Sequence, residues 1–258
     1  MTRTDLGTAA AAWASTSRVQ VGQRRVRYRE AGTGPTIVLV HGLAMAADYW
    51  SRTGPPLAAA GFHVLAPDLP GFGETEGPED GLGVHEQASA LRGWAEAVGL
   101  GPAVYMGHSL SCQTVLELAA TRPAWVTGLV LAAPTGDGGE RRMVAEAARL
   151  FLDAWRESLQ LLVLAGHAYL RAGPRRFFRT WKSGAKHDPL PLLPNIRVPV
   201  LVVVGGIDPV APLSFAAEIV GALADGRLEV IPEGTHAVFF EEPERFNAAV
   251  IGFVRGLS

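Results

Sequence analysis

Cysteine is almost absent from this chain, because Cys112 is the single example among 258 residues. One thiol cannot close an intrachain disulfide, so the sequence excludes a fold held by disulfide bridges and is typical of a reducing compartment. No apolar run approaches the roughly 20 residues of a membrane-spanning helix, and the formal net charge is only −2. A near-neutral chain lacks the basic surface that binds nucleic acid. We therefore expect a cytoplasmic protein with no nucleic-acid partner and no membrane partner.

The start of the chain lacks the features of a secretory signal. The alanine-rich stretch at residues 9–14 contains no leucine, isoleucine or valine, and Asp5 lies just before it. A secretory signal needs a strongly apolar central region preceded by positive charge. We interpret residues 1–17 as a loosely ordered N-terminal leader.

Patterns that bind metals or nucleotide cofactors are missing as well. The seven histidines and scattered carboxylates include no His-Glu-x-x-His motif. Gly71-Phe72-Gly73 has no third glycine at the spacing of a dinucleotide-binding fingerprint. We therefore expect neither a metal nor a nicotinamide or flavin cofactor, and we assign His85 to the surface.

Apolar sequence is abundant, at 48% hydrophobic against 19% charged residues, which is enough for a large core. Residues 18–30 alternate as in an antiparallel hairpin. Continuous apolar runs, typical of strands buried on both faces, follow at 36–40, 63–66, 103–106, 128–132, 198–204 and 227–231. Helical patterns separate most of these runs, at 83–98, 110–120, 212–223 and 243–257. This alternation predicts an α/β fold with a mostly parallel central sheet and helices on both faces.

One segment interrupts the alternation. Residues 135–194 contain no convincing strand, and apolar residues recur there at helical spacing, at Met143, Ala147, Leu150, Phe151 and Ala154. We interpret this segment as a helical cap inserted into a core that is formed by residues 18–134 and 195–258.

Polar residues stand at the ends of the predicted strands. They are His41, Asp68, Ser109 and Asp208, with His236 in the loop after the last strand. Ligands of open parallel sheets bind beyond the carboxyl ends of the strands. Ser109 lies between a buried strand and a helix, and the small residues at positions 107 and 111 suit a nucleophile on a tight turn. The alternative interpretation of Ser109 is an ordinary helix N-cap, which is common at this position.

Gly107-His108-Ser109-Leu110-Ser111 resembles the nucleophile elbow of the α/β-hydrolase superfamily, with Ser111 where that pattern has its second glycine. His41-Gly42-Leu43 is similar to the oxyanion loop of the same superfamily. The resemblance implies that the backbone N–H groups of Leu43 and Leu110 stabilise an oxyanion. It also implies structural roles for His41 and Asp68, and we assign Ser111 and Cys112 to packing.

Two further segments extend the resemblance, in the chain order Ser, Asp, His. Gly205-Gly206-Ile207-Asp208 resembles the segment that carries the acid of the superfamily's catalytic triad, and Gly234-Thr235-His236 resembles the histidine loop. The implied triad is Ser109, His236 and Asp208, in which His236 takes the serine proton and Asp208 orients the imidazole. Asp208 is also a common turn residue before proline, and Asp137 and Asp188 stay open as alternative acids. The resemblance covers most of residues 24–253 outside the cap.

The resemblance implies a hydrolase of carboxylic esters or related acyl compounds that works through an acyl-enzyme. A serine nucleophile argues against haloalkane dehalogenases and epoxide hydrolases, which attack through aspartate. A thioesterase or a lactonase is the nearest alternative. Carbon–carbon bond hydrolases rank lower, because they often carry asparagine and tryptophan where this chain has His108 and Ala237. A lyase or cofactor-free oxygenase on the same triad, and a non-catalytic small-molecule receptor, stay open as well.

The pocket for a small acyl substrate is expected between the core and the cap. Its candidate lining residues are Trp50, His108, Phe151, Trp155, Tyr169, Phe178 and Val210. A basic run in the cap comprises Arg171, Arg175, Arg176, Arg179, Lys182 and Lys186. We interpret this run as a solvated helix face. The alternatives are the binding of an acidic substrate group and the docking of a phosphopantetheine carrier protein.

Overall fold

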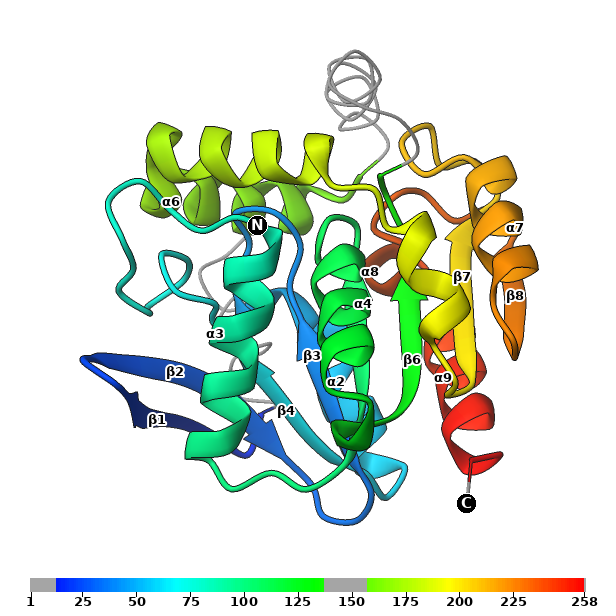
Figure 1. Ribbon diagram of the computed structural model, residues 1–258, viewed down its shortest axis with the longest axis horizontal. Coiled ribbons are helices and arrows are strands. Elements are labelled where there is room, and N and C mark those ends of the chain that lie inside the picture. Colours follow the sequence, from blue (N-terminus) through cyan, green and yellow to red (C-terminus); the bar gives the residue numbers. More distant parts are fainter. Residues whose placement is uncertain (1–12, 137–156, 258) are drawn as a thin grey trace.

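The computed structural model describes residues 13–136 and 157–257. An eight-stranded sheet runs through it in the order β1-β2-β4-β3-β5-β6-β7-β8 (Figure 1). β2 pairs antiparallel with both β1 and β4, whereas every neighbouring pair from β4 to β8 is parallel. The expected α/β fold with a mostly parallel sheet is therefore confirmed.

The strands follow the apolar runs of the sequence. Their bounds are β1 Ser15–Val21, β2 Arg24–Ala31, β3 Thr36–Val40, β4 His63–Pro67, β5 Ala103–His108, β6 Val126–Ala132, β7 Val200–Gly205 and β8 Gly226–Ile231. β5 and β7 are buried along their whole length, because strands flank them on both sides and helices cover both faces. The edge strand β8 alternates between more and less exposed residues.

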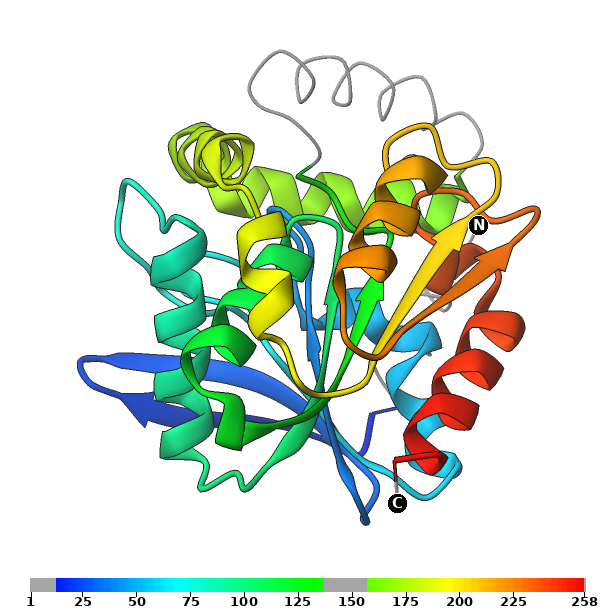
Figure 2. The ribbon, with the colours of Figure 1, turned by 45° about the vertical axis from the view of Figure 1, so that its right-hand side comes forward.

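Helices cover both faces of the sheet (Figures 1 and 2). One face carries α3 Val84–Ala97, α4 Ser111–Thr121, η2 Pro123–Trp125, η3 Leu190–Asn195 and α7 Leu213–Ala222. The other face carries η1 Ala47–Arg52, α2 Gly54–Ala59, α8 Val238–Glu241 and α9 Pro243–Arg255. α6, Leu159–Lys186, runs across the carboxyl ends of the strands, toward which the arrowheads of β6 and β7 point in Figure 1.

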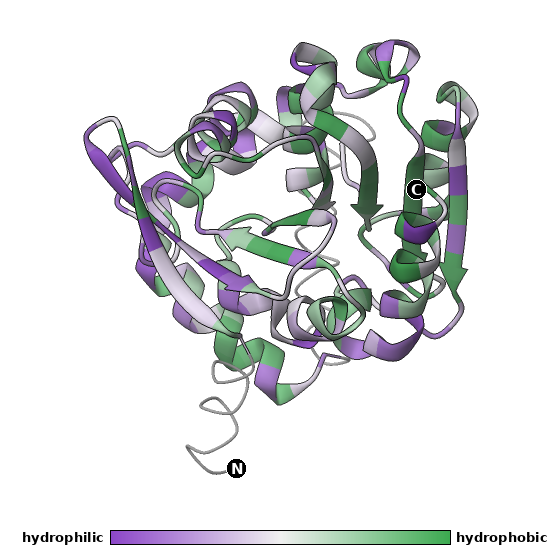
Figure 3. Cartoon of the chain, turned by 90° about the horizontal axis from the view of Figure 1, so that it is seen from below, coloured by the Kyte–Doolittle hydropathy of each residue, from purple (hydrophilic) through white to green (hydrophobic). Residues whose placement is uncertain are grey.

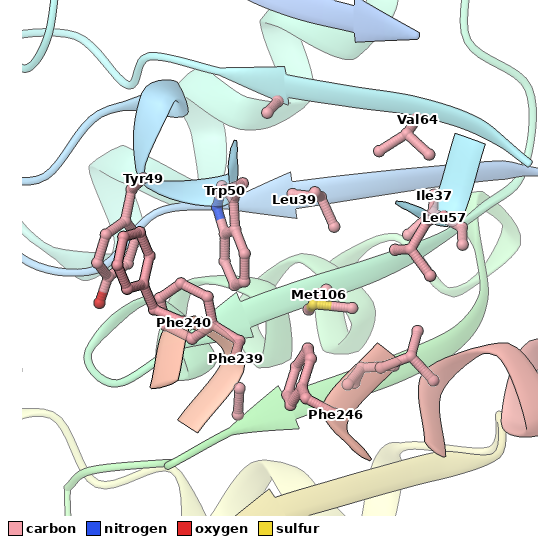
Figure 4. Close-up of a cluster of buried hydrophobic side chains, with 14 of the residues drawn as sticks. Ile37, Leu39, Tyr49, Trp50, Leu57, Val64, Met106, Phe239, Phe240 and Phe246 are labelled. Atoms are coloured by element: carbon pink, nitrogen blue, oxygen red, sulfur yellow. The ribbon is translucent and has the colours of Figure 1, made fainter. Parts of the chain in front are cut away.

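Two hydrophobic clusters, one on each side of the sheet, form the core. Alternate residues of β3 enter different clusters, with Ile37 and Leu39 in one and Val38 and Val40 in the other. This division follows from the two-residue period of a strand. In the first cluster the aromatic rings of Trp50, Phe239 and Phe246 pack beside these strands (Figure 4). A sheet that is apolar on both faces explains why its strands read as continuous apolar runs.

The first strand begins earlier than the sequence pattern predicts. β1 starts at Ser15, inside the segment assigned to the leader, and Trp13 is buried against Gly54. The reason is that Ser15, Thr16 and Ser17 pair with β2 through their backbone and show no apolar alternation. Purple and white predominate along the β1–β2 hairpin in Figure 3, in contrast to the green inner strands. Residues 1–12 lie outside the described residues.

Helical structure fills the described part of the predicted cap. α6 consists of two helical halves joined at Gly173, which directly precedes Pro174. The backbone angles of Gly173, φ 73° and ψ 160°, are not helical. Proline lacks the N–H that would continue the helical hydrogen bonds, so the helix breaks here. Residues 137–156, which include Phe151 and Trp155, lie outside the described residues. Among the described helices, α6 included, none combines the length and apolar character needed to cross a bilayer.

Candidate active site

Ser109 sits on a tight turn between β5 and α4. Its φ of 55° lies in the left-handed region, which is rare for a residue with a side chain and is often found at functional sites. The turn folds α4 closely over the end of β5. A Cβ atom on Gly107 would lie 2.6 Å from the Ser111 carbonyl oxygen, so only glycine fits at that position. The steric requirement expected for a nucleophile elbow is met at Gly107.

Ser111 replaces the second glycine of the elbow pattern and supplies a hydroxyl to it. The Ser111 Oγ accepts the backbone N–H of His108 at 2.8 Å and lies 2.8 Å from the Val40 carbonyl oxygen, to which it donates. Ser111 thereby links the end of β5 to the end of β3 beneath the turn. The sequence pattern assigned Ser111 to packing alone and missed this hydrogen bonding, because Val40 is distant in the chain.

His236, in the loop after β8, reaches the Ser109 hydroxyl. Its Nε2 lies 3.1 Å from Ser109 Oγ, and its Nδ1 lies 2.9 Å from the Asp208 Oδ2. A carboxylate can only accept, so the Nδ1 of a neutral His236 carries the proton and its Nε2 is free to accept from the serine hydroxyl. The three residues predicted as a triad therefore form one continuous hydrogen-bonded chain.

Asp208 is held in place by the backbone that follows it. Its Oδ1 accepts the N–H groups of Val210 at 2.7 Å and of Ala211 at 3.0 Å, and its side chain is fully buried. Burial acts to raise the pKa of Asp208, but the charge and hydrogen bond of His236 and the two N–H donors outweigh it and lower the pKa. Asp208 is thus a carboxylate beside the imidazole, and the alternative acid Asp188 makes a local hydrogen bond to the N–H of Leu190 instead.

Glycines bring the Asp208 loop and the His236 loop together. A Cβ on Gly205 would lie 2.1 Å from the carbonyl oxygen of Gly234, and one on Gly206 would lie 2.4 Å from that of Pro232. Any side chain at these two positions would push the loops apart. The backbone contact between the ends of β7 and β8 is what allows the 2.9 Å contact between Asp208 and His236.

His108, predicted as a substrate-lining residue, lies behind the triad. It is buried, its Nε2 donates to the carbonyl oxygen of His236 at 3.0 Å, and its Nδ1 accepts the Tyr49 hydroxyl at 2.9 Å. Burial, together with the nearby His236, lowers the pKa of His108 to about 3, so the ring is neutral near pH 7. Its hydrogen bonds hold the backbone of the histidine loop. Sequence reasoning missed Tyr49, whose partner is 59 residues away.

The predicted oxyanion donors lie beside the elbow. A Cβ on Gly42 would approach the carbonyl oxygen of His108 to 3.4 Å, so the loop that carries Leu43 packs directly against the turn that carries Leu110. Leu110 directly precedes α4, where the helix dipole favours negative charge. Within the described residues, no atom accepts a hydrogen bond from the backbone N–H of Leu43 or of Leu110.

His41 and Asp68 are engaged in loop hydrogen bonds. The Nδ1 of His41 donates to the Gly42 carbonyl at 2.9 Å and its Nε2 accepts the N–H of Leu69 at 3.0 Å. Asp68 accepts the N–H of Ala47 at 2.7 Å and the guanidinium of Arg27 at 2.9 Å. Both arrangements match the structural roles that the resemblance implied.

Cys112 is a core residue. It is buried within α4, and burial raises the pKa of its thiol, which opposes formation of a nucleophilic thiolate. Its Sγ lies 3.4 Å from the carbonyl oxygens of Gly107 and Ala132. Cys112 therefore packs under the elbow, as expected from the sequence.

The predicted substrate-lining residues that the structure describes do not lie together around one pocket. Trp50 has no exposed surface and packs against Phe239 in the core with tilted rings whose centroids are 4.4 Å apart, which corrects the expectation that it faces a pocket. Val210 is also buried, whereas Phe178 is 60% exposed on α6, pointing away from the core. Tyr169, also on α6, is partly exposed. The sequence indicated apolar residues at these positions but not the direction in which each side chain faces.

The basic run of α6 contacts the first turn of α3 and the segment before it. Arg175 pairs with Glu79 at 2.6 Å, Arg179 with Glu86 at 2.9 Å, and Arg176 donates to the Pro78 carbonyl at 3.0 Å. These three side chains therefore help to hold the helix on the core. Docking of a carrier protein at this run stays a prediction.

A cavity of about 380 Å³ lies under α6 on the side of Tyr49. Arg171 and His167 of α6 line it from above, and Arg27, Asp48 and Glu74 line it from the core. The cavity adjoins the Tyr49–His108 pair, but Ser109 does not line it.

Comparison with known proteins identifies the family to which this fold belongs. Residues 37–249 match the model of the alpha/beta hydrolase family. Because the match spans most of the chain, the protein belongs to that family of hydrolases.

Individual relatives differ in the reactions they are named for. A 2-hydroxy-6-oxo-6-phenylhexa-2,4-dienoate hydrolase of Burkholderia cepacia is 27% identical, over 89% of this chain and 91% of its own. A thermophilic esterase from Thermogutta terrifontis superposes with a TM-score of 0.81 at 24% identity, covering 95% of this chain and 99% of the other. The enol-lactonase from Burkholderia xenovorans LB400 superposes equally well, at 0.81 and 21% identity, covering 93% and 100%. These structural likenesses show a shared fold.

Proposed function

We propose that this protein is a serine hydrolase that cleaves a carboxylic ester or a related acyl compound through an acyl-enzyme. The observation that carries the proposal is the hydrogen-bonded chain from Ser109 through His236 to Asp208, with contacts of 3.1 and 2.9 Å. A neutral imidazole whose Nε2 faces a serine hydroxyl is poised to act as a general base.

In the first step, Ser109 Oγ attacks the acyl carbon while its proton moves to His236 Nε2. The electrons of the carbonyl double bond move to its oxygen, and the N–H groups of Leu43 and Leu110 stabilise the resulting oxyanion. The intermediate then collapses, the bond to the leaving group breaks, and His236 gives its proton to that group. Water attacks the acyl-enzyme by the same route and restores the Ser109 hydroxyl.

Asp208 has an electrostatic role in this scheme. It keeps the proton of neutral His236 on Nδ1 and stabilises the imidazolium that forms during attack. Its two backbone N–H donors hold the carboxylate in position, so it needs no reorganisation during the reaction. The low pKa of Asp208 supports a charged carboxylate throughout.

Carbon–carbon bond hydrolysis is the second candidate. The Burkholderia cepacia relative, and a Comamonas testosteroni relative that is 26% identical over 89% of this chain, are both named as 2-hydroxy-6-oxo-6-phenylhexa-2,4-dienoate hydrolases. Against this candidate stand His108 and Ala237, which differ from the residues that such enzymes often carry. The same triad serves either reaction, so the substrate decides between them.

The proposal is tested by measuring kcat and KM on a panel of 4-nitrophenyl esters of increasing chain length, matched thioesters, lactones and the phenylhexadienoate. We expect the highest kcat/KM on an oxygen ester or lactone. Ser109→Ala should lower kcat by about 10⁴-fold or more, while Ser89→Ala, an exposed serine on α3, should leave it unchanged. A 4-nitrophenyl alkylphosphonate should phosphonylate Ser109 Oγ with loss of 4-nitrophenol, so the peptide that contains Ser109 should gain the mass of the phosphonyl group in place of one hydrogen.

Two results would overturn the proposal. Full ester hydrolysis by Ser109→Ala would remove Ser109 as the nucleophile. A kcat/KM that is largest on the dienoate would move the assignment to the second candidate.

A further inference from the structure

Two histidines and a glutamate from three separate elements meet on the α3–α4 face of the molecule. Glu117 of α4 lies 2.7 Å, through Oε1, from the Nε2 of His187, which directly follows α6. Its Oε2 lies 3.1 Å from the Nδ1 of His85, which is on α3. One ligand atom from each of the three residues lies within 4.8 Å of the others. Figure 1 shows α3 and α4 side by side, with α6 above them.

We propose that His85, Glu117 and His187 bind a divalent cation of the zinc type. Two imidazoles and a carboxylate are a donor set that suits zinc, whereas Mg²⁺ prefers oxygen ligands alone. Tetrahedral zinc at about 2.0–2.2 Å from each donor sets the ligand atoms roughly 3.3–3.6 Å apart. The distances in the cluster, from 2.7 Å up to 4.8 Å, bracket that spacing. Small side-chain rotations would therefore seat the ion.

The burial of the three groups fits a cation site. The side chains of Glu117 and His187 are only 9% and 7% exposed, so the carboxylate has lost most of its contact with water. A buried carboxylate is costly unless a positive group balances it, and a divalent cation balances it fully. The His85 side chain is 73% exposed, which leaves an entry path and an open side for a water ligand.

Because of where the cluster lies, a bound ion would link the end of α6 to the core. The end of α6 already touches the core beside it, because Ser183 Oγ accepts the Val84 N–H at 3.0 Å. Gly184 packs so closely on Leu110 that an added Cβ would lie 2.6 Å from that side chain. A cation at the cluster would fasten the end of α6 to α3 and α4, next to the elbow turn. No local sequence motif marks these ligands, because His187 and Glu117 are 70 residues apart.

The experiment is zinc titration of the full chain after treatment with a chelator, followed by calorimetry and thermal unfolding. We expect one Zn²⁺ to bind through this cluster, and Tm to rise by about 5–10 °C at zinc a hundredfold above Kd. Co²⁺ in place of zinc should give the visible absorption of a nitrogen- and oxygen-bound ion, and Mg²⁺ should not raise Tm.

Two substitutions separate this site from adventitious binding. His85→Ala changes an exposed side chain and should weaken zinc binding roughly tenfold or more, without changing the Tm of the metal-free protein. His63→Ala is the matched control, because His63 also contacts a carboxylate, Glu30 at 2.8 Å, outside the proposed site. It should leave zinc affinity unchanged.

The proposal fails if the wild-type chain binds no zinc, in which case the cluster is held by contacts between its side chains alone. It also fails if His85→Ala binds zinc as tightly as the wild type, which would place the ion elsewhere. Ester hydrolysis by the metal-free protein is measured separately, so neither result bears on the proposed function.

Discussion

Single buried polar residues behind the triad contribute to its geometry without contacting Ser109. His108 is the clearest example, since both of its ring nitrogens are used, one by the Tyr49 hydroxyl and one by the carbonyl oxygen of His236. A neutral ring satisfies one donor and one acceptor at once, and a protonated ring would present a second donor to the Tyr49 oxygen. Burial, which lowers the pKa of His108 to about 3, favours the neutral ring that this pattern fits.

His108 should therefore make stability depend on pH. Its pKa is about 3 in the folded protein, against about 6.5 when unfolded. Between these values the unfolded chain binds a proton that the folded chain does not, so stability falls as pH falls, by about 1.4 kcal/mol per pH unit for one group. His108→Asn should remove this contribution, so its free energy of unfolding should fall less steeply from pH 6.5 to 4.5. Denaturant titrations at several pH values measure it, and parallel curves for the two proteins would contradict it.

Individual side chains were the hardest part to predict from sequence. Ser109, Asp208 and His236 were identified because each belongs to a motif that is contiguous in the chain. Tyr49, Arg27 and the Ser111 hydroxyl act on partners far away in sequence, so no local pattern marks them. Trp50 was misplaced for a related reason, because an aromatic residue after a strand end suits a core and a pocket equally well.

At the scale of secondary-structure elements, close backbone contact between loops decides whether Asp208 and His236 meet. Gly205→Ala should force its Cβ against the Gly234 carbonyl, now only 2.1 Å away from that position. We expect kcat to fall about tenfold or more, because the substitution would move Asp208 away from His236. We also expect a lower Tm. The measurement is ester hydrolysis together with thermal unfolding.

Gly221→Ala is the control for this change. Gly221 lies in α7, and an added Cβ there would meet nothing within 4 Å. Alanine is favoured over glycine in a helix by roughly 0.5–1 kcal/mol, so Tm should stay the same or rise with kcat intact. Equal activity of the Gly205 variant and the wild type would show that the two loops do not need this contact.

Elements were largely predictable from the sequence, because a sheet covered on both faces turns its strands into continuous apolar runs. The runs at 36–40 and 103–106 correspond to β3 and β5, with β5 extending to His108. The start of β1 was not predictable, since its first residues pair through the backbone and their side chains are polar. The rotation of α6 about its axis depends on contacts with residues 77–86, which its own sequence does not contain.

At the scale of the whole molecule, a buried arginine joins the N-terminal hairpin to the loops at the carboxyl edge of the sheet. Arg27 of β2 contacts Asp68 after β4 and Asp48 of η1, both at 2.9 Å, and its side chain is 2% exposed. Asp68 is fully buried and also accepts the N–H groups of Ala47 and Glu74. One ion-pair network therefore holds three segments together.

Arg27→Met should lower the free energy of unfolding by about 3–5 kcal/mol, because it leaves the buried Asp68 charge without its cation. Arg18→Met is the matched control. Arg18 pairs with Glu74, but the two side chains are 40% and 38% exposed, so its loss should cost about 1 kcal/mol or less. Urea denaturation of both variants gives the two values. A similar loss in both would mean that burial does not strengthen the network.

The spacing of the proposed triad along the chain also has a consequence for protein synthesis. Ser109 leaves the ribosome 127 residues ahead of His236, and the acid and base lie close together near the end of the chain. During that interval the growing chain carries the nucleophile without a partner to take its proton. Under the proposed mechanism, a nascent chain therefore has no general base for acyl hydrolysis until β8 and the loop after it have joined the sheet.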